Sequence, residues 1–97
     1  MLKIYSNVRA KLAGLKRSEF SDLNLALRVH IHNINRDKSL TRKPLAQTLA
    51  KHFSDTDRAI AAFHILRNRL SEQGVRYFPT EYGVRMLEQD IKEVLIL

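Results

Sequence analysis

Several residue types that often define a function are missing or scarce in this sequence. There is no cysteine among the 97 residues, which excludes disulfides, thiolate metal sites and a cysteine nucleophile. With three glycines and two prolines, the chain shows no Gly-rich phosphate loop, linker or low-complexity tract. No run approaches the roughly 20 apolar residues that span a bilayer, and the N-terminus lacks the apolar core of a signal peptide. We therefore expect a single cytoplasmic domain with no membrane partner.

The side chains that could carry chemistry are scattered along the chain. His30 and His32 would point to opposite sides of a helix, while His52 and His64 fall on different predicted helices without an H-E-x-x-H pattern. The carboxylates have the spacing of helix caps and solvated charges. We therefore expect no enzyme, no catalytic residue, no metal site and no cofactor.

Positive charge is what the sequence has in excess. The 17 Lys and Arg against 10 Asp and Glu give a formal net charge of +7, and the isoelectric point is near 10.2. On so short a chain this charge favours a polyanionic partner, usually nucleic acid. The alternative is that the excess Lys and Arg only keep the protein dissolved. At 44% hydrophobic and 28% charged residues, the rest of the composition is that of an ordinary folded domain.

The spacing of apolar residues predicts a helix over residues 3–15. Residues 19–35 fit two patterns, because their apolar side chains alternate as in a strand and also share one face of a helix. We favour the helix, since Leu and Ala are good helix formers. Such a helix would carry Leu25 and Val29 on a second apolar face, which the N-terminal helix or a second subunit would have to cover.

The second half of the chain has the most informative order of elements. A short helix is followed by a turn with the spacing of a capping box, and a longer basic helix then ends at a glycine suited to a left-handed conformation. A brief extended segment and a C-terminal helix follow. The signals in chain order are the cap residue Thr41, Phe53 at the end of the short helix, Ser54 and Asp57 in the capping box, Gly74, and Val75–Phe78.

This order, with T-E-Y-G opening the last helix, resembles the winged helix-turn-helix superfamily of DNA-binding regulators. The resemblance covers about half the chain and implies a mainly α fold with a minimal β wing. The wing would be Val75–Phe78 alone or a VRYF and VRML pair across PTEYG. The implied domain spans residues 1–97, with a winged-helix-like three-helix core over 19–83, an N-terminal helix over 3–15 and a C-terminal helix over 81–97.

In proteins of that superfamily the outward face of the longer helix enters the major groove. Here that face of residues 55–73 would hold Ala61, Ala62 and Ile65, of which Ala61 or Ile65 could touch thymine methyl groups. Asp55 at the start of the helix argues against close contact, because a carboxylate repels phosphate. The resemblance implies base or phosphate contacts for Arg58 and Arg69, a base contact for Asn68, and phosphate contacts for Arg42, Lys43 and Arg76.

From these features we expect a small DNA-binding protein that acts on double-stranded DNA as a transcription regulator of plasmid or phage type. We expect a homodimer through the C-terminal helix, because its stripe from Val84 to Leu95 has more apolar surface than one core requires. Alternatively, that stripe folds back onto Leu25 and Val29 and completes a monomer. The alternative function is a non-catalytic adaptor or inhibitor that uses the same scaffold to bind a protein or a nucleic-acid-binding complex.

Overall fold

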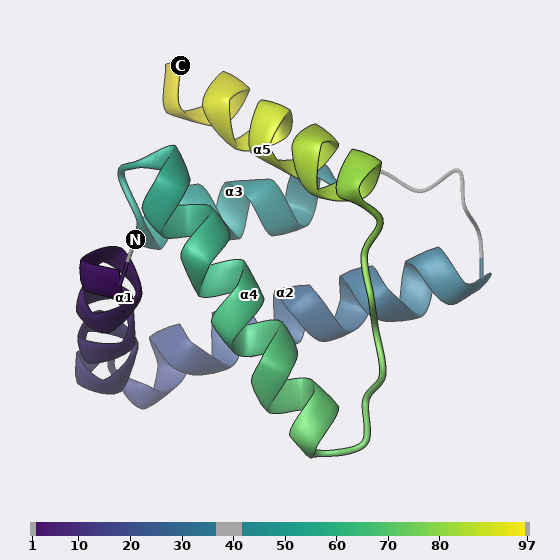
Figure 1. Cartoon of the computed structure of the whole chain (residues 1–97), viewed down its shortest axis with the longest axis horizontal. Helices are drawn as coiled ribbons and strands as arrows, with labels where there is room; N and C mark the ends of the chain where they lie inside the picture. Colours follow the sequence, from purple (N-terminus) through teal and green to yellow (C-terminus); the bar gives the residue numbers. More distant parts are fainter. Residues whose placement is uncertain (1, 37–41, 97) are drawn as a thin grey trace.

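The computed structural model describes residues 2–36 and 42–96 (Figure 1), and within these ranges all regular secondary structure is helical. The mainly α fold is confirmed, as is the helix, rather than a strand, in the ambiguous region 19–35. The described helices are α1 (Leu2–Gly14), α2 (Arg17–Arg36), α3 (Lys43–His52), α4 (Thr56–Glu72) and α5 (Glu81–Ile96).

The predicted β wing is wrong. Residues 75–80 form no regular secondary structure and pair with no strand in the described part of the chain, because the VRML residues that would pair with VRYF lie inside α5. The segment instead packs on the core through half-buried Val75 and Tyr77. The backbone carbonyl of Tyr77 accepts a hydrogen bond of 3.5 Å from Arg67 of α4. The described chain is thus a helical domain without a wing.

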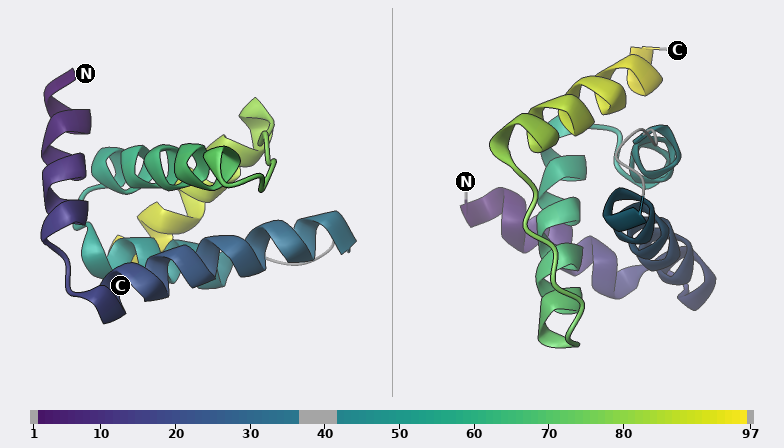
Figure 2. Two further views of the ribbon diagram at one scale, coloured as in Figure 1. Left: turned by 90° about the horizontal axis from the view of Figure 1, so that it is seen from below. Right: turned by 90° about the vertical axis from the view of Figure 1, so that its right-hand side faces the viewer.

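Helix α4 lies at the centre and contacts all four other helices. In Figures 1 and 2, α1 crosses near the N-terminal end of α4, and α5 lies over α3 and the N-terminal part of α4. The predicted outward face of α4 is wrong, because Ala61, Ala62 and Ile65 are buried. Alanine side chains let neighbouring helices approach closely, so this second face is also packed. The buried residues of α4 are Ala59, Ala61, Ala62, Phe63, Ile65, Leu66 and Leu70.

Both ends of α4 are fixed by local hydrogen bonds. The N-cap is Asp55, one residue later than the predicted Ser54, and its carboxylate accepts from the backbone N–H groups of Asp57 and Arg58. At the other end Gly74 has a φ of 90°. The N–H groups of Gly74 and Val75 donate to the carbonyls of Ser71 and Leu70, which is a Schellman motif.

The apolar stripe of α5 is used within the monomer. Leu87 and Ile91 are buried, and Val84 and Leu95 pack against the core. The helix packs mainly on α3, and not on Leu25 and Val29, which remain 61% and 46% exposed. The stripe therefore gives no reason for a dimer through α5, and a homodimer stays a prediction.

The start of α3 differs in part from the prediction. The predicted cap residue Thr41 lies outside the described residues. Arg42 occupies the N-cap position without a side-chain capping hydrogen bond, and Pro44 lies in the first turn, where a missing N–H group costs nothing.

Candidate nucleic-acid interface

The six residues predicted to contact nucleic acid lie in three places. Three belong to α4, two stand at the start of α3, and one is in the extended segment before α5. Lys43, Asn68 and Arg76 are exposed and hold no ion pair among the described residues. The other three, Arg42, Arg58 and Arg69, each contact a neighbouring side chain.

Arg42 links α3 to α5 inside the monomer. Its Nε lies 3.1 Å from a carboxylate oxygen of Asp90, and the two side chains are only 30% and 13% exposed. Burial, together with the Arg42 charge, lowers the pKa of His30 on α2. The Nε2 atom of His30 lies 3.5 Å from the hydroxyl of Tyr77, and burial raises the pKa of that hydroxyl. Arg42 is thus part of the packed junction between the helices.

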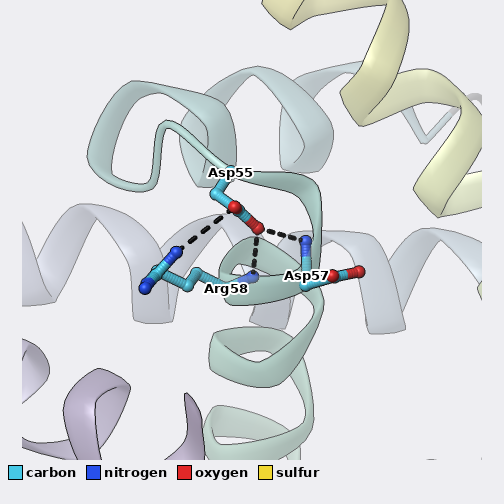
Figure 3. A network of polar contacts seen from close by, with 3 residues as sticks. All are labelled: Asp55, Asp57 and Arg58. Atoms are coloured by element: carbon cyan, nitrogen blue, oxygen red, sulfur yellow. Dashed lines mark hydrogen bonds and ion pairs between the residues drawn. The ribbon is translucent and has the colours of Figure 1, made fainter.

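Arg58 stands beside the cap of α4 (Figure 3). Its guanidinium lies 3.2 Å from the Asp55 carboxylate, and both side chains are close to half exposed. Asp55 therefore offsets part of the Arg58 charge while it holds the guanidinium near the N-terminus of α4. An exposed pair of this kind contributes little to stability.

Two α4 arginines point toward the N-terminal part of the chain. Arg58 and Lys11 of α1 line the same surface hollow of about 320 Å³. Arg69, three helical turns further on, has its guanidinium carbon 5.6 Å from the centre of the Phe20 ring at the start of α2. Lys11 makes the corresponding contact with Phe53, at 5.0 Å. These contacts place both arginines beside α1 and the first turn of α2.

The N-terminal region carries charged side chains of one sign. The first 18 residues contain five cations and no Asp or Glu. All five side chains are exposed, and in the described ranges none of them forms an ion pair. We call this set the basic surface: Lys3, Arg9, Lys11, Lys16 and Arg17.

Glu19 is the first carboxylate after the basic surface in the sequence, and it contacts groups of neighbouring residues. Glu19 accepts a hydrogen bond of 2.9 Å from the backbone N–H of Lys16, and its other oxygen lies 4.0 Å from Nδ1 of His52. Glu19 therefore caps α2 and reaches toward α3. The left view of Figure 2 shows α1 at one side of the molecule, across the ends of α2 and α4, so its outer side is free of other described elements.

These cations are visible in the sequence, but apolar spacing alone predicts only a core-closing role for the N-terminal helix. What marks the region in the sequence is that five cations precede the first carboxylate, Glu19. In a stretch with both signs of charge, the positive and negative side chains would offset one another on a solvated face. A stretch with one sign creates a local positive potential.

Other kinds of site find little support in the described residues. No group of three or more His, Cys, Asp or Glu side chains is placed to hold a metal ion there. None of the described helices has the length and apolar character that crossing a membrane requires. Comparison of the chain with protein-family models, curated proteins and solved structures finds no match.

Proposed function

We propose that this protein binds double-stranded nucleic acid through the basic surface, mainly by contacts to backbone phosphates. The observation that carries the proposal is the acid-free N-terminal stretch, whose five cations are all exposed. Arg58 and Arg69 extend this surface from α4. Each cation that meets a phosphate releases condensed counterions, and this gives affinity without sequence recognition.

The surface fits a duplex better than a single strand. Proteins that bind single strands combine a basic groove with aromatic rings on which the bases stack. The most exposed aromatic side chains of the described residues are Phe78 and Tyr82, in and after the extended segment rather than on α1. Of the rings near the basic surface, Phe20 and Phe53 are covered by Arg69 and Lys11, and Tyr5 of α1 is half-buried and packs against the core. Phosphate contact along a duplex requires no free ring.

The proposed surface changes which residues we expect to contact nucleic acid. Arg42 is left out of the proposed site, because its guanidinium is paired with Asp90. Base contacts by Asn68 and Arg69 remain a prediction, as do phosphate contacts by Lys43 and Arg76. With α4 packed on most sides, the proposal assigns affinity to α1 and the start of α2.

The proposal is tested by titrating labelled random-sequence duplex DNA at about 50 and about 200 mM salt, the range over which phosphate contacts weaken most visibly. We expect binding at low salt that weakens steeply as salt is added. The variant Lys16→Gln/Arg17→Gln should weaken binding and flatten the log–log salt dependence by about two units, because each phosphate that a cation neutralises adds roughly 0.9 to the slope.

The matched control is Arg85→Gln/Lys92→Gln, which removes one Arg and one Lys from exposed positions on α5. Both variants reduce the formal charge by two, so overall charge affects them equally. We expect the α5 variant to keep the steep salt dependence. An equal loss of affinity in both variants would show that the basic surface is not the site. The absence of binding by the unmodified protein at low salt would refute the function.

A further inference from the structure

The outer side of α2 carries an apolar surface that no other described part of the chain covers. Leu25 is 61% exposed and Val29 is 46% exposed, although each belongs to the middle of a 20-residue helix. Between α2 and α3 lies a hollow of about 360 Å³, lined by these two side chains together with Pro44, Leu45 and Thr48. A projecting Leu therefore stands beside a hollow that can receive an apolar side chain.

The exposed residues of this side follow the spacing of a helix-pairing seam. Asp22, Leu25, Val29 and His32 are separated by three, four and three residues, and all four are exposed. We call this set the outer stripe. Intervals of three and four keep side chains along one line that faces a second helix. The half-buried Ala26 beside the line is small enough for a second helix to approach closely.

Charge along α2 determines which partner helix fits. Its N-terminal part holds Arg17 and the two acids Glu19 and Asp22, whereas residues 23–36 contain no carboxylate and include Arg28, Arg36 and His32. A parallel copy would bring acid against acid. An antiparallel copy centred at the level of Leu27 places Asp22 opposite the basic end of its partner, so the outer stripe is complementary to itself.

We propose that the protein forms a two-fold symmetric homodimer in which the outer stripes of two α2 helices pack antiparallel. In this dimer Leu25 lies opposite the partner's Val29, and Asp22 lies opposite the partner's His32. Each Leu25 enters the hollow between α2 and α3 of the other copy. The interface is isologous, so the same four residues serve on both sides and the assembly closes at two copies. It leaves α1 and the basic surface of each copy outside the contact.

Sedimentation equilibrium over a concentration series tests the dimer with the whole chain. We expect a reversible equilibrium between a species of 11.3 kDa and one of twice that mass. The variant Leu25→Gln/Val29→Gln should raise the dissociation constant at least tenfold, which is the effect of about 1.4 kcal/mol. Its helical circular dichroism and melting temperature, measured at low concentration, should match the unmodified protein because neither side chain is in the core.

A control variant separates a specific interface from general stickiness. Phe78→Gln/Ile96→Gln removes two side chains that are 73% and 84% exposed but belong neither to the outer stripe nor to the lining of the hollow beside it. It should leave the dissociation constant unchanged. A monomer at every concentration overturns the proposal. An unchanged constant in the α2 variant, or an equally raised constant in the control, does the same.

The orientation of the helices is tested by exchanging charges. His32→Asp places two carboxylates opposite each other in the antiparallel dimer, and Asp22→Lys removes the carboxylate that faces the partner's His32, so each single variant should weaken association. The double variant Asp22→Lys/His32→Asp places a Lys opposite a carboxylate and should recover most of the affinity. Asp22→Asn gives a further test, because it weakens an antiparallel dimer but strengthens a parallel one. A stronger dimer with Asp22→Asn, or no recovery in the double variant, would refute the antiparallel arrangement.

Discussion

Helices α2 and α4 both carry apolar residues on more than one side, yet they occupy very different positions. Helix α4 is enclosed by the other four helices, and its second apolar face is buried. Helix α2 packs on α3 and α4 through Leu23, Leu27 and Ile31 but leaves Leu25 and Val29 open. Apolar spacing in the sequence predicts an exposed second face on α4, and a second face on α2 that the N-terminal helix or a second subunit would cover.

The size of the side chains explains the difference. The second face of α4 contains Ala61 and Ala62, which are buried at 2% and 0% exposure. Small side chains let helix axes come close, so a helix at the centre of a small domain can be packed on several sides. Leu25 and Val29 project further and would hold a neighbouring helix away. A second apolar face of alanines therefore indicates a central helix, whereas one of larger aliphatic residues indicates a surface available to another chain.

Among the substitutions that compare α4 with the exposed parts of the molecule, Phe63→Ala should lower the free energy of unfolding the most. Phe63 is fully buried in α4 and packs edge-on against Tyr77, so its removal leaves a cavity that costs about 3–5 kcal/mol of unfolding free energy. Urea denaturation at equilibrium measures the loss. Phe78→Ala is the matched control, because Phe78 is 73% exposed and should change the free energy by about 0.5 kcal/mol or less. Similar losses in the two variants would contradict the central position of α4.

Much of the fold could be predicted from the spacing of apolar residues. The helices at residues 3–15, 19–35 and 81–97 follow from it, and Gly74 ends α4 as expected. The wing could not be excluded in this way, because VRML fits both a strand and the first turns of a helix. Its place in α5 depends on contact with α3, which lies about 40 residues earlier in the chain.

The candidate site could be predicted less well, since it depends on how the helices are arranged. The position of Arg42 before a helix favours a phosphate contact, but its partner Asp90 lies 48 residues away and no local pattern links them. Helical spacing correctly places Arg58 and Arg69 on one side of α4, yet that side faces α1 and the start of α2. Local spacing indicates the face of a helix, whereas its neighbours follow only from the packed structure.

The next largest effect on the unfolding free energy should come from a larger side chain at one of the buried alanines of α4, which tests directly whether those positions are closely packed. Ala62 is completely buried, so Ala62→Leu adds a bulky side chain to a packed interior. We expect the unfolding free energy to fall by about 1–3 kcal/mol. Ala13→Leu makes the same change at an exposed position of α1 and should be close to neutral. Thermal and urea unfolding of both variants would measure the contrast. If Ala62→Leu proved as stable as Ala13→Leu, close packing around α4 would be refuted.

The inner side of α2 should make stability depend on pH. The folded protein lowers the pKa of His30 below 6.5, chiefly by burial and also through the charge of Arg42. The unfolded chain therefore binds a proton more readily, and unfolding free energy falls as the pH drops from 6.5 through the lower folded pKa. His30→Gln should make this fall shallower, as measured by urea titrations between about pH 5 and pH 7.

Burial and the neighbouring Arg67 also lower the pKa of His64, so some pH dependence should remain in His30→Gln. Adding His64→Gln should reduce it further. A fall as steep in the double variant as in the unmodified protein would show that neither imidazole is responsible.

The smallest effect is expected on the outer side of α2, where Leu25→Gln should change the unfolding free energy of the monomer by about 0.5 kcal/mol or less. Gln has nearly the helix propensity of Leu, so the substitution tests burial rather than helix formation. The matched variant is Leu27→Gln, two residues further along the same helix, where the side chain is completely buried. It should be strongly destabilising, because it removes apolar contacts and places an amide in the core. Urea unfolding at a concentration low enough to keep the chain monomeric separates these effects from association. A large loss of stability from Leu25→Gln under those conditions would mean that part of the same chain covers this face, and the surface offered to a second copy would not exist.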